Sequence, residues 1–158
     1  LVQWKGKLPA GKTYDQPVIQ LDLHSTALAA AGLVRAVKEQ IGPPLDGVDL
    51  LPHLLGEVTT PPHDALYWRF GEQTAIRSGN HKLVKARGGS GDWELYDLAA
   101  DIGETKNLAA DKPDVAKDLL AKYDAWNAGN IKPLWGAPAA GGKGKGGQKK
   151  LLKKVDSN

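Results

Sequence analysis

Two carboxylates with the potential for chemistry stand close together in the stretch "ELYDLAADIGETKNL", residues 94–108. Asp101 and Glu104 follow a strand-like run and share their segment with Gly103 and Asn107. Such a pair could bind a metal ion, act as acid and base in catalysis, or hold a chain corner in place. The spacing does not fit an EF-hand calcium loop, and the local sequence supplies no further partner or pocket for acid–base catalysis. The two acids therefore indicate a structural clasp.

The clasp is expected to comprise four charged residues: Arg77, Lys82, Asp101 and Glu104. Asp101 would stabilise the turn by accepting hydrogen bonds from the neighbouring backbone. Arg77 lies opposite Lys82 in a predicted hairpin, and like charges in that position destabilise a sheet. We expect the Glu104 carboxylate to relieve this repulsion, and we predict a pair between Glu104 and Arg77.

The other reactive side chains form no catalytic or metal-binding pattern. The histidines at positions 24, 53, 63 and 81 lack the H-x-x-x-H spacing of a zinc site, and the chain contains no Cys. The glycines around Ser90 match neither a nucleophile elbow, a Walker loop nor a dinucleotide-binding fingerprint. The sequence therefore predicts no catalytic residue and no metal ligand.

The elements that carry these residues fall into two parts, and the first covers residues 1–56. A strand is predicted at residues 1–6 and a helix at residues 21–32, with Asp22 as its cap. A second helix or helical turn is predicted at 33–42, and a short helical segment at 51–55. The first helix carries an apolar stripe expected to pack on a sheet: Leu23, Ala27, Leu28 and Ala31.

The second part, residues 57–135, is predicted to be β-rich and to end in a helix. "DALYWRFG" alternates as an antiparallel strand does, and "QTAIRSGNHKLVKAR" reads as a hairpin turning at Gly79-Asn80. That register places Ile76 opposite Leu83. A helix capped by Asp111 would then lay an apolar stripe on the sheet: Leu119, Leu120, Tyr123 and Trp126. The expected fold class is α+β, a four-stranded antiparallel sheet packed by a C-terminal helix.

Bulk composition suggests a piece of a longer, folded polypeptide with a basic tail. The chain has 158 residues and no Met, and no apolar run approaches the length of a membrane helix, so no membrane span is predicted. From Gly136 onward it is Gly-rich and holds six Lys and one Asp, so residues 136–158 are predicted to be disordered. An anionic-polymer partner is conceivable, but a solvated tail is the simpler interpretation. No aromatic residues interleave with the lysines, which argues against nucleic acid.

Five motifs in order resemble the carboxy-terminal portion of arylsulfatase-type sulfatases, which have the alkaline-phosphatase-like α/β fold. They are "VQWKGKLPAG", "QLDLHSTALAAAG", "LDGVDLLPHLLGE", "HDALYWRFGEQTAIRSGNHKLVK" and "WELYDLAADIGETKNLAADKPDVAKDLLAKYDAW". The resemblance covers about residues 1–128. It departs at Ile102, where the family usually has Pro, and at His81, where an aromatic residue is frequent. On this resemblance, residues 1–56 are a remnant of the large sulfatase domain, and residues 57–135 are the small C-terminal domain.

The resemblance implies a parent enzyme that hydrolyses aryl or carbohydrate sulfates. Its formylglycine nucleophile would come from a C/S-x-P-x-R motif, and calcium would polarise the sulfate. No serine here begins that motif, so both cofactors are expected in a preceding part, and this chain alone is expected to be inactive. The resemblance also implies that the parent protein is exported or periplasmic, as is usual in the family. The substrate and the oligomeric state are left open.

The family also uses this portion at the rim of the substrate pocket. His63, Trp68 and Arg69 are the candidates, because aromatic and cationic groups suit a sulfated sugar or an aryl sulfate. Purely structural roles for all three are the simpler expectation. A second class of function also stays open, namely a non-catalytic module of sulfatase fold that binds anionic polymers through the Lys-rich tail.

Overall fold

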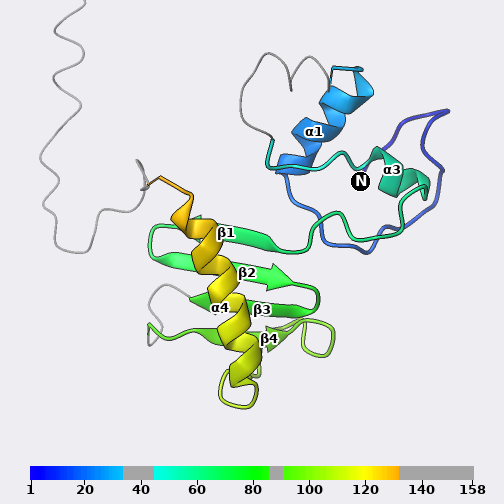
Figure 1. Cartoon of the computed structure of the whole chain (residues 1–158). Coiled ribbons are helices and arrows are strands. Elements are labelled where there is room, and N and C mark those ends of the chain that lie inside the picture. Colours follow the sequence, from blue (N-terminus) through cyan, green and yellow to red (C-terminus); the bar gives the residue numbers. More distant parts are fainter. Residues whose placement is uncertain (34–44, 86–90, 132–158) are drawn as a thin grey trace, which may run out of the picture.

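The computed structural model describes residues 1–33, 45–85 and 91–131. Its elements form two groups: two helices lie together, and a sheet is crossed by a long helix (Figure 1). In chain order the elements are α1 (Leu21–Ala30), α3 (Leu51–Leu55), β1 (Leu66–Phe70), β2 (Gln73–Ser78), β3 (His81–Lys85), β4 (Glu94–Asp97) and α4 (Pro113–Ala128).

The sheet is a four-stranded antiparallel meander in the order β1-β2-β3-β4. The predicted hairpin is confirmed, because Ile76 pairs with Leu83 and Arg77 with Lys82. Gly79 in its turn has φ +56°, a conformation that favours glycine. The alternation of side chains therefore sends Ile76 and Leu83 to one face, and Arg77 and Lys82 to the other.

The core lies between the sheet and α4, which covers one face of it (Figure 1). Ile76, Leu83 and Leu95 are fully buried there against Leu119 and Tyr123 of α4, so the predicted stripe and the α+β fold class are confirmed. Aromatic rings pack against each other at the edges of this core. Tyr67 stacks on Trp126 with centroids 4.9 Å apart, and Trp93 meets Tyr123 edge to face.

The predicted strand at residues 1–6 is wrong. The carbonyl of Trp4 accepts bonds from Lys7 N at 3.0 Å and Leu8 N at 2.9 Å, so the chain turns there. A strand needs a hydrogen-bonded neighbour, and the sheet among the described residues contains only β1–β4. Apolar alternation alone could not supply that neighbour.

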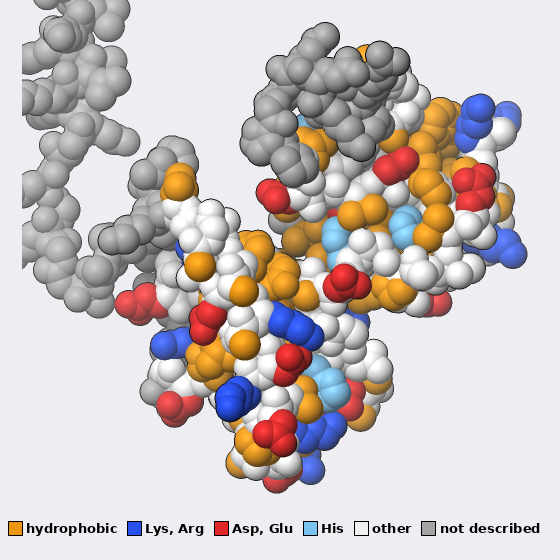
Figure 2. Space-filling view, in the orientation of Figure 1, with side chains coloured by type: hydrophobic (Ala, Val, Ile, Leu, Met, Phe, Trp, Pro, Cys, Tyr) orange, Lys and Arg blue, Asp and Glu red, His pale blue; other side chains and the backbone are white. Residues whose placement is uncertain are grey.

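Helix α1 forms where it was predicted, but it buries polar side chains in place of the predicted apolar stripe. Its buried residues are Asp22 and Ser25, whereas Leu21 is 47% exposed and Leu23 is 67% exposed. Figure 2 shows hydrophobic side chains reaching the surface of this part of the molecule. The expected apolar packing of α1 on a sheet is therefore absent among the described residues.

Two predicted helix caps are also wrong. The N-cap of α1 is Gln20, with Asp22 inside the helix, and the N-cap of α4 is Lys112 rather than Asp111. Helix α3 matches the predicted segment. Most of the helix predicted at 33–42 and all of the tail from Gly136 lie outside the described residues. Within the described ranges, no helix is both long and apolar enough to cross a membrane.

Candidate functional site

The three rim candidates do not converge on one site. His63 binds the carboxylate of Asp22 beside α1. Arg69 lies on the α4 side of the sheet, where its guanidinium donates to Asn127 Oδ1 and to the carbonyl of Ile131. Trp68, the neighbour of Arg69 in β1, points to the opposite face and is 38% exposed. A strand cannot present two successive side chains to one pocket.

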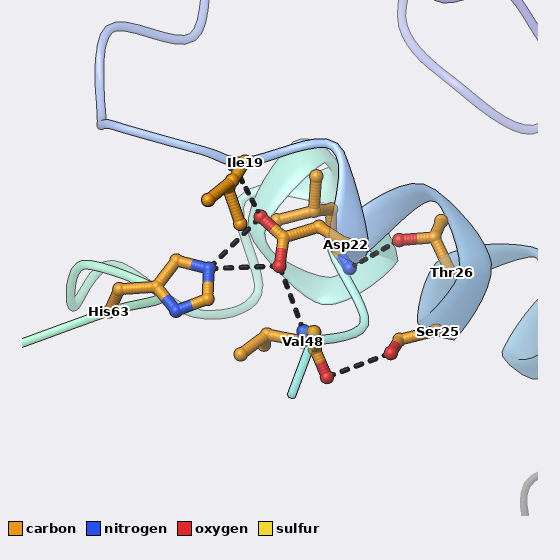
Figure 3. A network of polar contacts seen from close by, with 8 residues as sticks. Ile19, Asp22, Ser25, Thr26, Val48 and His63 are labelled. Carbon is orange, nitrogen blue, oxygen red and sulfur yellow. Dashed lines mark hydrogen bonds and ion pairs between the residues drawn. The ribbon is translucent and has the colours of Figure 1, made fainter. Parts of the chain in front are cut away.

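The Asp22 carboxylate is a fully buried polar group, 0% exposed, with three hydrogen-bonding partners. Ile19 N donates to Oδ2 at 2.8 Å, and Val48 N donates to Oδ1 at 2.9 Å. His63 Nε2 lies 2.9 Å from each carboxylate oxygen (Figure 3). We call Ile19, Asp22, Val48 and His63 the Asp22 hub.

Neighbouring side chains of α1 extend this hub to the segment before α3. Ser25 Oγ donates to the carbonyl of Gly47 at 2.8 Å, and Leu50 N donates to Thr26 Oγ1 at 3.0 Å (Figure 3). Gly47 itself packs against the first turn of α1, so closely that a Cβ there would lie 2.2 Å from the carbonyl oxygen of Leu21. Glycine is therefore required for this approach.

The hub keeps Asp22 ionised. Burial by itself raises the pKa of Asp22, but the backbone donors of Ile19 and Val48 and the ring of His63 outweigh it. The pKa therefore lies below its ordinary value. A buried carboxylate held in its ionised form by three partners acts as a structural group. Sequence reasoning missed this role; the available signal was a lone carboxylate enclosed by apolar residues in "VIQLDLHS".

The face of the sheet opposite α4 carries a concavity of about 440 Å³. Trp68, Arg77, Lys82 and Glu104 line it together with small and aliphatic residues: Ala75, Val84 and Leu98. Its volume is within the range of small-molecule sites. It combines an aromatic ring with two cations and one carboxylate, which is a composition suited to an anionic ring compound.

The predicted clasp residues lie at this concavity and at the turn beside it. Lys82 Nζ donates to Glu104 Oε1 at 2.5 Å, whereas Arg77 Nε donates to the carbonyl of Gly79 at 3.2 Å. The carboxylate thus meets the lysine, and among the described interactions Arg77 takes a backbone partner in place of the predicted Glu104. Glu104 adopts φ +54°, a costly conformation for a residue with a side chain.

Asp101 accepts three bonds within the turn, as a clasp residue would. Its donors are Thr105 N at 2.7 Å, Thr105 Oγ1 at 3.1 Å and Lys106 N at 2.8 Å. The bond from the Lys106 backbone lowers the pKa of Asp101 most, desolvation opposes it, and the bonds from Thr105 help to hold the pKa below its ordinary value. The carboxylate is fully used by its own turn.

The charged side chains of both arrangements are bonded to neighbouring groups. Within the described ranges, no group of three or more His, Asp and Glu residues is placed to hold a metal ion. The chain has no Cys, and the two Ser of the described ranges, Ser25 and Ser78, donate their hydroxyls to backbone carbonyls and not to a base. These residues can position a chain or contact a ligand.

Comparison with known proteins shows that the chain is similar to parts of two sulfatases. No model of a known protein family matches the chain. Over 107 residues, 67% of the chain, it is 36% identical to the N-acetylgalactosamine-6-sulfatase of Canis lupus familiaris. Over 63 residues, 39% of the chain, it is 41% identical to an uncharacterized sulfatase of Schizosaccharomyces pombe. The chain spans only 19% and 11% of the lengths of these two proteins.

Solved structures show the same relationship. Ps i-CgsB superposes on 87% of the chain with a TM-score of 0.67 and 25% identity, and the match covers 30% of its own chain. A 2-O GAG sulfatase superposes on 68% of the chain with a TM-score of 0.51 and 27% identity, and the match covers 24% of its own chain. In each case the chain corresponds to a minor part of a larger molecule.

Proposed function

Because the chain matches the carboxy-terminal portion of sulfatases of the alkaline-phosphatase-like fold, we propose that it is the carboxy-terminal part of an enzyme that hydrolyses sulfate esters. The observation that carries this proposal is the 36% identity over 107 residues to a named sulfatase. The two parts of the described chain agree with it, because the small sheet domain has its own core while α1 exposes leucines that a larger domain would cover.

In this proposal the chemistry belongs to the preceding part of the enzyme. A formylglycine nucleophile and a calcium ion would lie there, and residues 1–158 alone would not turn over substrate.

The contribution of this chain to the substrate would come from the open face of the sheet. Trp68 offers an exposed ring, and Arg77 offers a guanidinium whose Nε donates to the Gly79 carbonyl. Lys82 is already paired with Glu104. Of the three rim candidates, Trp68 is therefore the one we retain, joined by Arg77, for a sulfated carbohydrate or aryl sulfate.

The first experiment is to sequence the coding DNA upstream of Leu1 and to express the complete reading frame. We expect an in-frame C/S-x-P-x-R motif, and calcium-dependent hydrolysis of p-nitrophenyl sulfate by the whole protein. The 158-residue chain assayed in parallel should show no activity. A start codon close to Leu1, or a complete protein without sulfatase activity, would contradict the proposal.

The charge of the tail favours a second candidate function. Six of the 21 Lys and Arg residues fall after Gly136 beside a single Asp, so this segment could bind an anionic polymer. Retention of the chain on a heparin column should then fall when residues 136–158 are removed. Equal retention of both forms would leave the sulfatase proposal alone.

A further inference from the structure

The Asp22 hub joins three segments that are distant in sequence. Ile19 precedes α1, Val48 lies in the segment before α3, and His63 leads into β1. The hub therefore connects the amino-terminal part, residues 1–56, to the small sheet domain, residues 57–135, of which the structure describes residues 57–85 and 91–131. Among the described residues, His63 is the one that reaches the hub from the sheet side.

Packing beside the hub is incomplete. A cavity of about 250 Å³ lies at the junction, with Leu21 and Asp46 on one side and His63, Tyr67 and Trp126 on the other. Apolar contact across the junction is therefore limited, in contrast to the close packing beneath α4. Other hydrogen bonds across residue 56 are local ones, from Glu57 and Val58 to the carbonyl of Pro52. The Asp22–His63 contact is the long-range polar link in the described chain.

We propose that the Asp22 hub is a latch: the contact between Asp22 and His63 holds the amino-terminal part against the small sheet domain, and breaking it releases that part while the sheet stays folded. The sheet domain can remain folded because its core of Ile76, Leu83 and Leu95 lies under α4 and meets the junction at its edge, through Tyr67 and Trp126. The described residues of the amino-terminal part form no comparable apolar core, since Leu50 is their one buried apolar side chain, beside the polar Asp22 and Ser25.

The latch also fixes where β1 begins. Leu66 follows His63 closely, and β1 carries Trp68 on the open face. Closing the latch therefore sets the position of α1 relative to that face. This consequence for the rim rests on the proposed function, whereas the latch itself is a property of the chain and is tested without any activity.

The test is hydrogen–deuterium exchange on the intact chain carrying Asp22→Asn or His63→Phe. In Asp22→Asn the new amide N–H group faces the backbone donors of Ile19 and Val48 and cannot accept from them. In His63→Phe a ring of similar size remains, but it has no nitrogen to bond Asp22. We expect exchange in residues 19–33 and 45–55 to rise by about tenfold or more, and exchange in β2–β4 to change by less than about twofold. The matched controls are the exposed Asp114→Asn and His24→Phe, which should change neither region.

Two results would overturn the latch. One is equal acceleration in both regions, which would make the chain a single cooperative unit; the other is no acceleration in either. If Asp22→Asn yields no folded protein, His63→Phe alone decides between these outcomes. In a double variant, the two substitutions should cost little more than the more severe single one, because both remove the same contact. Additive effects would contradict a shared link.

Discussion

The two parts of this chain are each stabilised by a different kind of interaction. The small sheet domain buries aliphatic and aromatic residues between the sheet and α4, with Ile76, Leu83 and Leu95 fully buried. The amino-terminal part organises itself around a buried carboxylate and leaves Leu21 and Leu23 at the surface. An apolar core stabilises a domain by itself, whereas a polar hub fixes geometry without supplying much net free energy. Stability and positioning are thus divided between the two parts.

The largest expected effect tests that division with one leucine from each part. Leu83→Ala removes a fully buried side chain and should lower the free energy of unfolding by about 2 to 5 kcal/mol. Leu23→Ala, at a position 67% exposed, should change it by no more than about 0.5 kcal/mol. Urea unfolding followed by far-ultraviolet circular dichroism measures both. Similar losses for the two variants would show that α1 is covered after all.

The next effect concerns the close approach of Gly47 to α1. Gly47→Ala places a Cβ 2.2 Å from the carbonyl oxygen of Leu21, so the segment must move, at a cost of about 1 to 3 kcal/mol in the amino-terminal part. Gly129→Ala is the control, since a Cβ there would lie 3.6 Å from the carbonyl oxygen of Trp126, an ordinary van der Waals contact. Hydrogen exchange at residues 45–55 should accelerate only in the first variant. Unchanged exchange there would mean that the approach is not tight.

A smaller effect is expected in the sheet domain, at the clasp. Lys82 and Glu104 are partly exposed, at 25% and 32%, so Glu104→Gln should cost about 1 kcal/mol or less and lower Tm by a few degrees. The loss should shrink in high salt. Asp118→Asn, which breaks the more exposed pair with Lys122, should leave Tm unchanged. A Tm for Glu104→Gln equal to that of the wild type would show that the Lys82–Glu104 pair contributes no stability.

The smallest effect compares one aspartate from each part, Asp22 and Asp101, by NMR titration of their carboxyl groups. Both pKa values lie below the ordinary value, so both groups bind fewer protons in the folded chain than in the unfolded one. Their stabilisation is therefore fully present above the ordinary carboxyl pKa near 3.8, and is lost as the pH falls through each folded pKa. A midpoint for Asp101 above 3.8 would contradict its role in the turn.

Sequence alone predicted what depends on neighbours in the chain or across a hairpin. The pairing of Ile76 with Leu83 followed from alternation and a Gly-Asn turn, and the stripe on α4 followed from helical spacing. The hub could not be predicted in this way. Local rules made Asp22 a helix cap, because nothing in "DLHS" shows that Val48 and His63, 26 and 41 residues away, will meet it.

The rim candidates illustrate the same limit on a smaller scale. Trp68 and Arg69 were nominated together for their chemistry, although strand alternation separates adjacent side chains. The structure places the ring of Trp68 at the open face and bonds Arg69 to Asn127 at the end of α4. Residue type indicated a possible partner, and strand geometry decided which residue could reach it.

The order of the strands has a consequence for how the chain folds. In a meander every strand pairs with its neighbour in sequence, so each loop to be closed is short and the chain entropy lost at each step is small. The contact between Asp22 and His63 closes a loop of 41 residues. We therefore expect the sheet to nucleate first and the carboxylate to find its histidine last, so that unfolding begins where folding ends, at α1.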